Sequence, residues 1–239
     1  MKNKFLLPAI AAVLSVCACA EARAETFITG FEQKVEKPEK AKGAQLRTRA
    51  NEVVTMVMAK RFVEAEKLAN TLRKDYEAEF SPKLRQFSFP SHVEYDEFRK
   101  TTRTQFELVD WGYKECLQML ALIQSERRDF SAALRTLEDV ERIAPVSANT
   151  AIETGYVLNQ LGKPEKGLAA YQKARDLSLK YTSQRTFRAA ALRGMGFALI
   201  DLKRLDEAER LFRESLEVEP MNKVALSELA YIQSIRKTK

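Results

Sequence analysis

The chain has 239 residues, of which 45% are hydrophobic and 31% charged, and its formal net charge is +7. These proportions indicate a globular protein with enough apolar material for a core, and the low content of Gly (8) and Pro (7) argues against a loop-rich or β-sandwich fold. Basic and acidic residues are interspersed, as at positions 207–210. This mixture is typical of a solvated helix surface and speaks against a nucleic-acid-binding patch.

Residues 1–24 have the pattern of a secretion signal. Two lysines precede 16 uncharged residues at 5–20, and residues 22–24 read Ala-Arg-Ala, a small–x–small cleavage pattern that places the mature start at Glu25. An uncharged stretch of this length is shorter than the roughly 20 residues that cross a bilayer, so cleavage is favoured over a membrane anchor. The expected location is therefore the periplasm of a bacterium.

A lipoprotein signal is the alternative, with acylation at Cys17 or Cys19 and a location at the outer membrane. Membrane contact is expected only in that case. Removal of residues 1–24 leaves Cys116 as the single cysteine, so no intramolecular disulfide is expected. Cys116 lies beside Leu117 on an apolar helix face, which predicts a buried core residue rather than a reactive thiol.

Residues 25–43 are polar and lysine-rich without an apolar period, and we expect a flexible lead. Residues 44–113 are expected to form an atypical helical region. Within it, residues 45–60 and 62–76 each carry apolar side chains at three- and four-residue spacing, which predicts a first helical hairpin.

The connection that follows this hairpin is irregular. Prolines bracket the aromatic residues between 80 and 92, which we expect to dock back onto the helices. From Val93 the apolar spacing predicts one long helix toward Arg127, broken or kinked at Gly112. Trp111, the only tryptophan, is expected to pack between the two halves of the chain rather than to anchor a partner.

The half from 114 to 239 is regular, and its clearest part is residues 189–222. Apolar and small side chains recur there on two successive helix faces, and Pro220 ends the second helix. The residues that carry this pattern are Leu192, Met195, Gly196, Leu199, Ala208, Phe212, Ser215 and Pro220. They resemble the tetratricopeptide repeat, a 34-residue helix–turn–helix unit. Further units that fit the same family positions start at 148 and 114, and a degenerate one starts near Leu46.

The resemblance implies an all-α fold of stacked antiparallel helix pairs, a TPR-like right-handed α-solenoid. The step from the unit at 148 to the unit at 189 exceeds one repeat by seven residues, which we expect in a lengthened helix around 180–188. Residues 223–239 start like a first helix with no second helix after it. A stack of repeats must cover its last apolar face, so this segment is predicted to be a C-terminal capping helix.

Residues suited to catalysis or metal binding are scarce. His92 is the only histidine, so neither a histidine-based metal site nor a supported Ser/His/Asp arrangement is expected. No phosphate-binding Gly-rich loop and no HExxH or GxSxG pattern occurs in the sequence. The sequence therefore predicts a protein without a cofactor, without a metal and without enzymatic activity.

In the resembled family, the first helices of the units line a concave groove. Carried onto this chain, the family's groove positions predict a partner-binding strip of nine residues: Gln118, Leu122, Asn149, Tyr156, Asn159, Gln160, Arg193, Phe197 and Tyr231. Aromatic side chains supply contact area at low entropic cost, and amides and Arg hydrogen-bond a peptide backbone. The alternative for Tyr156 and Phe197 is packing on neighbouring helices.

The resemblance implies a non-catalytic scaffold or adaptor in the bacterial periplasm that binds a peptide or a partner helix in the groove. Two alternatives stay open. One is an outer-membrane lipoprotein that scaffolds secretion or pilus assembly. The other is a periplasmic inhibitor of the immunity type, with a single tight partner.

Overall fold

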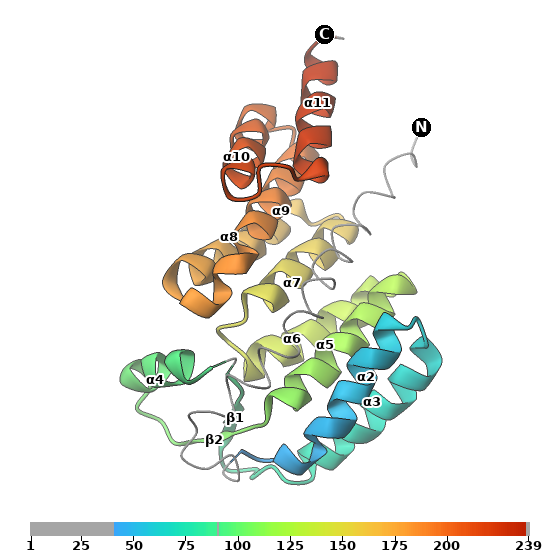
Figure 1. Cartoon of the computed structure of the whole chain (residues 1–239), viewed down its shortest axis with the longest axis vertical. Coiled ribbons are helices and arrows are strands. Elements are labelled where there is room, and N and C mark those ends of the chain that lie inside the picture. The colour runs from blue at the N-terminus through green and yellow to red at the C-terminus, as the bar shows by residue number, and fades with distance from the viewer. Residues whose placement is uncertain (1–40, 90, 238–239) are drawn as a thin grey trace. The chain divides into compact units, whose positions relative to one another are not determined.

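The computed structural model describes residues 41–89 and 91–237. The predicted secretion signal with Cys17 and Cys19, and all but the last three residues of the predicted lead, lie outside the described residues. The described part divides into two compact units, residues 41–150 and residues 151–237, and each is considered by itself. Helices dominate both units, as predicted (Figure 1).

The first unit holds two helical hairpins with an insertion between them. Its elements in chain order are the 3-10 helix η2 (Ala44–Leu46), α2 (Arg47–Met58), α3 (Phe62–Glu77), β1 (Arg85–Phe87), α4 (His92–Thr101), β2 (Phe106–Leu108), α5 (Trp111–Glu126) and α6 (Phe130–Ile143). Helix α7 (Ala148–Gln160) begins in this unit and continues into the next.

The second unit continues the succession of helices. Its further elements are α8 (Pro164–Lys180), the 3-10 helix η3 (Thr182–Phe187), α9 (Arg188–Asp201), α10 (Leu205–Val218) and α11 (Lys223–Lys237). Contacts join α8 to α9, α9 to α10 and α10 to α11, so that each helix packs on its neighbour in the chain. None of the helices in the described part combines the length and hydropathy that a membrane span requires.

The hairpin predicted at 45–76 is confirmed as α2 and α3, and both of these helices pack on α5. Val53 and Leu72 are fully buried, as their spacing predicted. Cys116 on α5 is also fully buried, and burial raises the pKa of its thiol to about 12, with Glu115 and Asp110 adding to the rise. Its predicted role as a core residue is confirmed.

The prediction of one long helix from Val93 toward Arg127 is wrong. Helix α4 ends at Thr101, and β2 lies between α4 and α5. Strand β2 pairs in parallel with β1, and Lys42 forms a parallel bridge with Val109 on the other side of β2. The apolar spacing looked helical because residues of α4 and of β2 reach one common aromatic cluster, not because they share one helix.

That cluster consists of Phe87, Phe89, Tyr95, Phe98 and Phe106. Phe87 and Phe89 are almost fully buried, and ring centroids within the cluster lie 4.9 to 6.3 Å apart. The aromatic residues between 80 and 92 therefore do dock, and their contacts are with α4 and β2. Because five rings are shared, the cluster holds α4 against the two-stranded sheet (Figure 1).

Asp110 joins the sheet to the first hairpin and starts α5. Its carboxylate accepts hydrogen bonds from Arg47 Nε at 2.7 Å and Arg47 Nη2 at 2.5 Å, and it caps α5 by accepting from the Gly112 amide at 2.8 Å. The Tyr76 hydroxyl donates to the same carboxylate at 3.3 Å. Only 3% of the Asp110 side chain is exposed, so this is a buried, fully engaged charge.

In the second unit, the extra residues predicted around 180–188 are found there, and only part of them lengthens a helix: α8 has 17 residues, whereas α6 and α10 have 14 each. Helix α8 ends at Lys180, and the separate 3-10 helix η3 leads into α9. Tyr181 and Gln184 are buried. The 3-10 helix packs on both α8 and α9.

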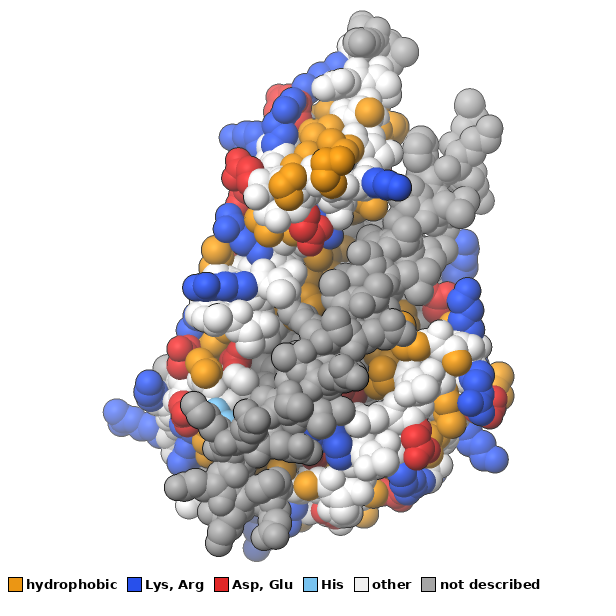
Figure 2. Space-filling model, viewed as in Figure 1, with side chains coloured by type: hydrophobic (Ala, Val, Ile, Leu, Met, Phe, Trp, Pro, Cys, Tyr) orange, Lys and Arg blue, Asp and Glu red, His pale blue; other side chains and the backbone are white. Residues whose placement is uncertain are grey.

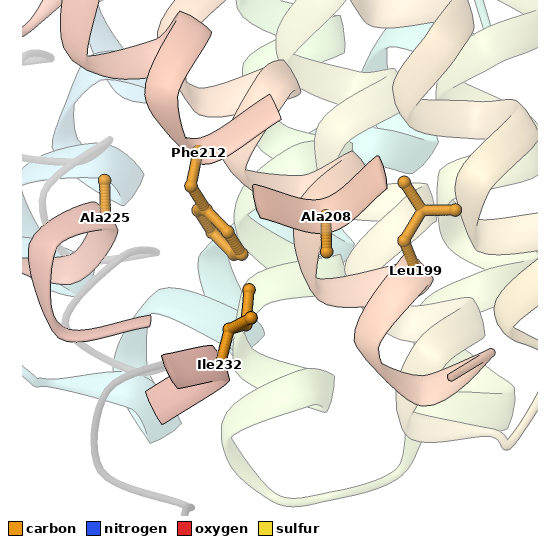
Figure 3. Packing of buried hydrophobic residues seen from close by; sticks show 5 residues of the cluster. All are labelled: Leu199, Ala208, Phe212, Ala225 and Ile232. Atoms are coloured by element: carbon orange, nitrogen blue, oxygen red, sulfur yellow. The ribbon is translucent and has the colours of Figure 1, made fainter. Parts of the chain in front are cut away.

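Helix α11 is present where the capping helix was predicted. Its residues Ala225 and Ile232 are fully buried in a cluster with Leu199, Ala208 and Phe212 (Figure 3). The apolar side chains of α11 thus extend the core of the last hairpin.

Charged side chains of both signs are mixed over the molecular face in Figure 2, as the interspersed sequence predicted.

We predict that Asp110→Ala lowers the free energy of unfolding by about 3 kcal/mol, because it leaves Arg47 without its partner and removes the α5 cap. Urea unfolding followed by circular dichroism measures this loss. Asp75→Asn is the matched control, since Asp75 pairs with Arg49 on an exposed surface and should cost no more than about 0.5 kcal/mol. Equal losses in the two variants would contradict a special role for Asp110.

Candidate functional site

The nine residues predicted to bind a partner lie on the first helices of successive hairpins, α5, α7, α9 and α11. Three of them fall in the first unit and six in the second. On α5, α7 and α9 they recur at spacings of three, four or seven residues, which places them on one face of each helix. By helix, they are Gln118 and Leu122 on α5, Asn149, Tyr156, Asn159 and Gln160 on α7, Arg193 and Phe197 on α9, and Tyr231 on α11.

In the second unit, a single buried ring determines how α7 and α9 approach each other. Tyr171 of α8 is 4% exposed, and its ring fills the space beside two glycines. A methyl group at Gly155 of α7 would lie 2.8 Å from that ring, and one at Gly194 of α9 would overlap it directly. The two glycines therefore position the helices that carry Tyr156 and Phe197.

The same arrangement recurs in the next hairpin, formed by α9 and α10. A methyl group at Gly196 of α9 would lie 2.7 Å from the ring of Phe212 on α10. Ala208, also on α10, lies in the cluster around Phe212. A glycine on a first helix thus accommodates a ring from the second helix in both hairpins of the second unit.

Comparison with known proteins agrees with this geometry. A family model described as tetratricopeptide repeat matches residues 147–218. Within the chain, this matched segment is similar to tetratricopeptide repeats. No curated protein matches the chain.

Solved structures with the same fold include tetratricopeptide repeat proteins at low sequence identity. A tetratricopeptide repeat protein from Parabacteroides merdae is 17% identical, with a TM-score of 0.55; the match covers 82% of this chain and 62% of that protein. MamA from Desulfovibrio magneticus RS-1 is 12% identical, with a TM-score of 0.53, and the match covers 82% of this chain and 88% of MamA. These likenesses concern the fold.

Within the repeats, two of the predicted residues are already engaged inside the second unit. Arg193 is 6% exposed, and its Nη1 donates to Glu219 Oε2 at 2.6 Å. Glu219 also accepts from Asn222, so Arg193 fastens α9 to the turn before α11. Asn159 turns its Oδ1 toward Gly167 of α8, where a methyl group would overlap it. Neither side chain is directed only at solvent.

The side chain of Phe197 is partly packed in the core and partly exposed to solvent. Its ring meets Phe212 edge to face with centroids 5.4 Å apart, and the residue is half-buried. Tyr156 and Tyr231 are half-buried as well, and Gln160 is exposed. These four residues keep accessible surface on α7, α9 and α11 of the second unit. The groove predicted through Gln118, Leu122 and Asn149 of the first unit stays a prediction.

On α5, the predicted positions are more enclosed. Gln118 is 1% exposed and Leu122 8% exposed. Lys114, one turn before Gln118, is also buried; its Nζ lies 3.1 Å from Glu115 Oε1 and 4.7 Å from the centre of the Trp111 ring. The preferred role for Trp111, packing between the two halves of the chain, also stays a prediction.

Residues 41–89 and 91–237 contain no group of three or more His, Cys, Asp or Glu side chains that could hold a metal ion.

Sequence reasoning missed Gly194, which is as important for the approach of α9 to Tyr171 as Gly155 is for α7. Its signal was present in the sequence, because a glycine two positions before Gly196 in an otherwise helical run is costly unless something large packs against it.

We predict that Gly194→Ala lowers the free energy of unfolding by about 1 to 2 kcal/mol. Alanine favours a helix by about 1 kcal/mol, but its methyl group overpacks the site against Tyr171. The matched control is the same substitution in a Tyr171→Ala background. There the ring is absent, and Gly194→Ala should be neutral or stabilising in urea unfolding. A loss of the same size in both backgrounds would rule out the contact with Tyr171 as its cause.

Proposed function

We propose that this protein is a non-catalytic scaffold or adaptor that holds a peptide or a partner helix on the first helices of its tetratricopeptide repeats. The observation that carries the proposal is the partial exposure of Tyr156, Phe197 and Tyr231 on successive first helices, together with exposed Gln160. Each aromatic ring presents apolar area that is already held in place by its helix. Such rings bind a partner with a small loss of side-chain entropy.

The buried packing below these residues supports this proposal. Tyr171 and Phe212 fill the spaces beside Gly155, Gly194 and Gly196, so α7 and α9, which carry Tyr156 and Phe197, are closely packed on α8 and α10. A binding surface on rigid helices needs no reorganisation when a partner arrives. Arg193 is compensated by Glu219, so recognition of a free C-terminal carboxylate is not part of the proposal.

We predict that Tyr156→Ala combined with Phe197→Ala weakens partner capture by about tenfold or more, because two aromatic anchors are lost. Capture by the immobilised protein from envelope extracts, quantified by mass spectrometry, measures the effect. Leu179→Ala is the control, since Leu179 is an exposed apolar residue of the second helix α8. Since Phe197 also contacts Phe212, circular dichroism must show that the double variant is folded.

If the double variant unfolds, the same capture experiment is done with Tyr156→Ala alone. Capture of the same proteins at the same level by a folded variant would refute the proposed surface.

The location proposed for this function is the bacterial periplasm. Its support is the sequence pattern of residues 1–24, with positive charge, an uncharged stretch and a small–x–small end. A lipoprotein acylated at Cys17 or Cys19 is the competing proposal from the same residues.

Mass spectrometry of the N-terminus of the protein isolated from its host separates the two proposals. We expect a mature chain that begins at Glu25. A chain that begins with an acylated cysteine would replace the soluble periplasmic scaffold with an outer-membrane lipoprotein. An unprocessed chain that begins at Met1 would contradict both.

A further inference from the structure

The insertion in the first unit carries two arginines that form no salt bridge with any of the described carboxylates. The guanidinium carbon of Arg85 lies 5.4 Å from the centre of the Phe87 ring, and that of Arg99 lies 5.4 Å from the centre of the Phe106 ring. Phe87 and Phe106 contact each other with their ring centroids 5.1 Å apart. The two guanidinium groups therefore stack on one contacting pair of rings.

Stacking leaves the hydrogen-bonding edge of a guanidinium group available. The ring attracts the face of the cation, whereas the N–H donors lie in its plane and point past the ring. Such an arginine is held in place before any anion arrives, and phosphate and carboxylate groups accept from its donors in pairs. Both arginines are exposed.

The carboxylates closest in sequence do not neutralise this pair. Within the part of the chain that the structure describes, no salt bridge joins Arg85 or Arg99 to an acidic residue. Glu107 lies next to Phe106 but accepts from the Ser81 amide and the Gln86 side chain. Most other arginines differ in this respect: Arg47, Arg49, Arg61, Arg73, Arg127, Arg142, Arg175, Arg188, Arg193, Arg204, Arg213 and Arg236 each form a salt bridge.

More positive charge lies close to the pair in sequence. Lys83, Lys100 and Arg103 are exposed and come within four residues of Arg85 or Arg99. Asp96 and Glu97 of α4 offset part of this charge, and cations remain in excess between residues 83 and 103. Tyr95 stands one helical turn before Arg99, is half-buried, and meets the Phe106 ring at 6.2 Å. The segments that carry the two arginines and this partly accessible aromatic cluster are therefore rich in cations.

We propose that Arg85 and Arg99, stacked on the contacting rings of Phe87 and Phe106, bind the phosphate groups of an anionic membrane surface. A lipid surface fits this patch better than one acidic peptide, because the cations come from a loop, a strand and a helix and are all exposed. Many phosphates side by side satisfy them together, and a half-buried tyrosine suits the headgroup region. The sequence alone predicted membrane contact only through an acylated cysteine.

The test measures binding of the protein, purified as its host processes it, to vesicles. One set contains phosphatidylcholine with phosphatidylglycerol, and the other contains phosphatidylcholine alone. We expect binding to the anionic vesicles that weakens as salt is added, and little binding to the neutral ones. Arg85→Gln with Arg99→Gln should reduce binding to the anionic vesicles by about tenfold or more, given the contribution of each cation near such a surface.

The matched control is Lys67→Gln with Lys74→Gln, which removes the same charge from exposed positions of α3. This variant should bind the anionic vesicles nearly as well as the unaltered protein. If both double variants lost the same amount of binding to anionic vesicles, the loss would be due to net charge alone, and the proposal would be overturned. Equal binding to neutral and anionic vesicles would overturn it as well.

Polyglutamate is the second probe. Binding to polyglutamate that depends on Arg85 and Arg99, without binding to anionic vesicles, would assign the patch to an acidic polypeptide and overturn the membrane proposal. Circular dichroism checks folding. Arg99→Gln alone, on an exposed position of α4, carries the test if the double variant unfolds, with an expected loss of about fivefold.

Discussion

The repeats of the second unit depend on one packing constraint, a large ring placed against glycine. Tyr171 and Phe212 each occupy a space that a side chain at Gly155, Gly194 or Gly196 would close. Because protein interiors are packed as densely as organic crystals, such a contact leaves little freedom in the distance between helices. The spacing of the helices that carry Tyr156 and Phe197, and with it the proposed binding surface, follows from this constraint.

The first unit depends on a different kind of interaction. Asp110 combines a buried ion pair with Arg47, a contact with Tyr76 and the cap of α5, and it directly follows the residue that bridges to Lys42. Polar contacts of this kind fix geometry without any apolar period in the sequence. They hold in place the segment that is inserted in sequence between the two helical hairpins and contains the small parallel sheet and α4. Arg85 and Arg99 belong to this inserted segment.

Predictions from sequence succeeded where one helix face determined the answer. The hairpin of α2 and α3, the repeats, the burial of Cys116 and the helix after Pro220 follow from apolar spacing and a proline stop. Prediction failed between residues 93 and 110, because strand pairing with residues 85–87 is a contact distant in sequence. The site shows the same limit: spacing placed Arg193 and Asn159 on the predicted helices, but their contacts with Glu219 and Gly167 come from neighbouring elements.

The sequence by itself determined the helical class, the family resemblance and the helices on which the candidate residues stand, since these depend on periodicity within one segment. Tertiary structure alone decided which of these side chains remain accessible to solvent and which are buried by packing against other elements. It also decided that the extra residues near 182–187 form a 3-10 turn and that two arginines stack on one pair of rings. The physical reason is that burial, ion pairing and ring contacts depend on the partner that folding brings alongside, and no local pattern in the chain specifies that partner.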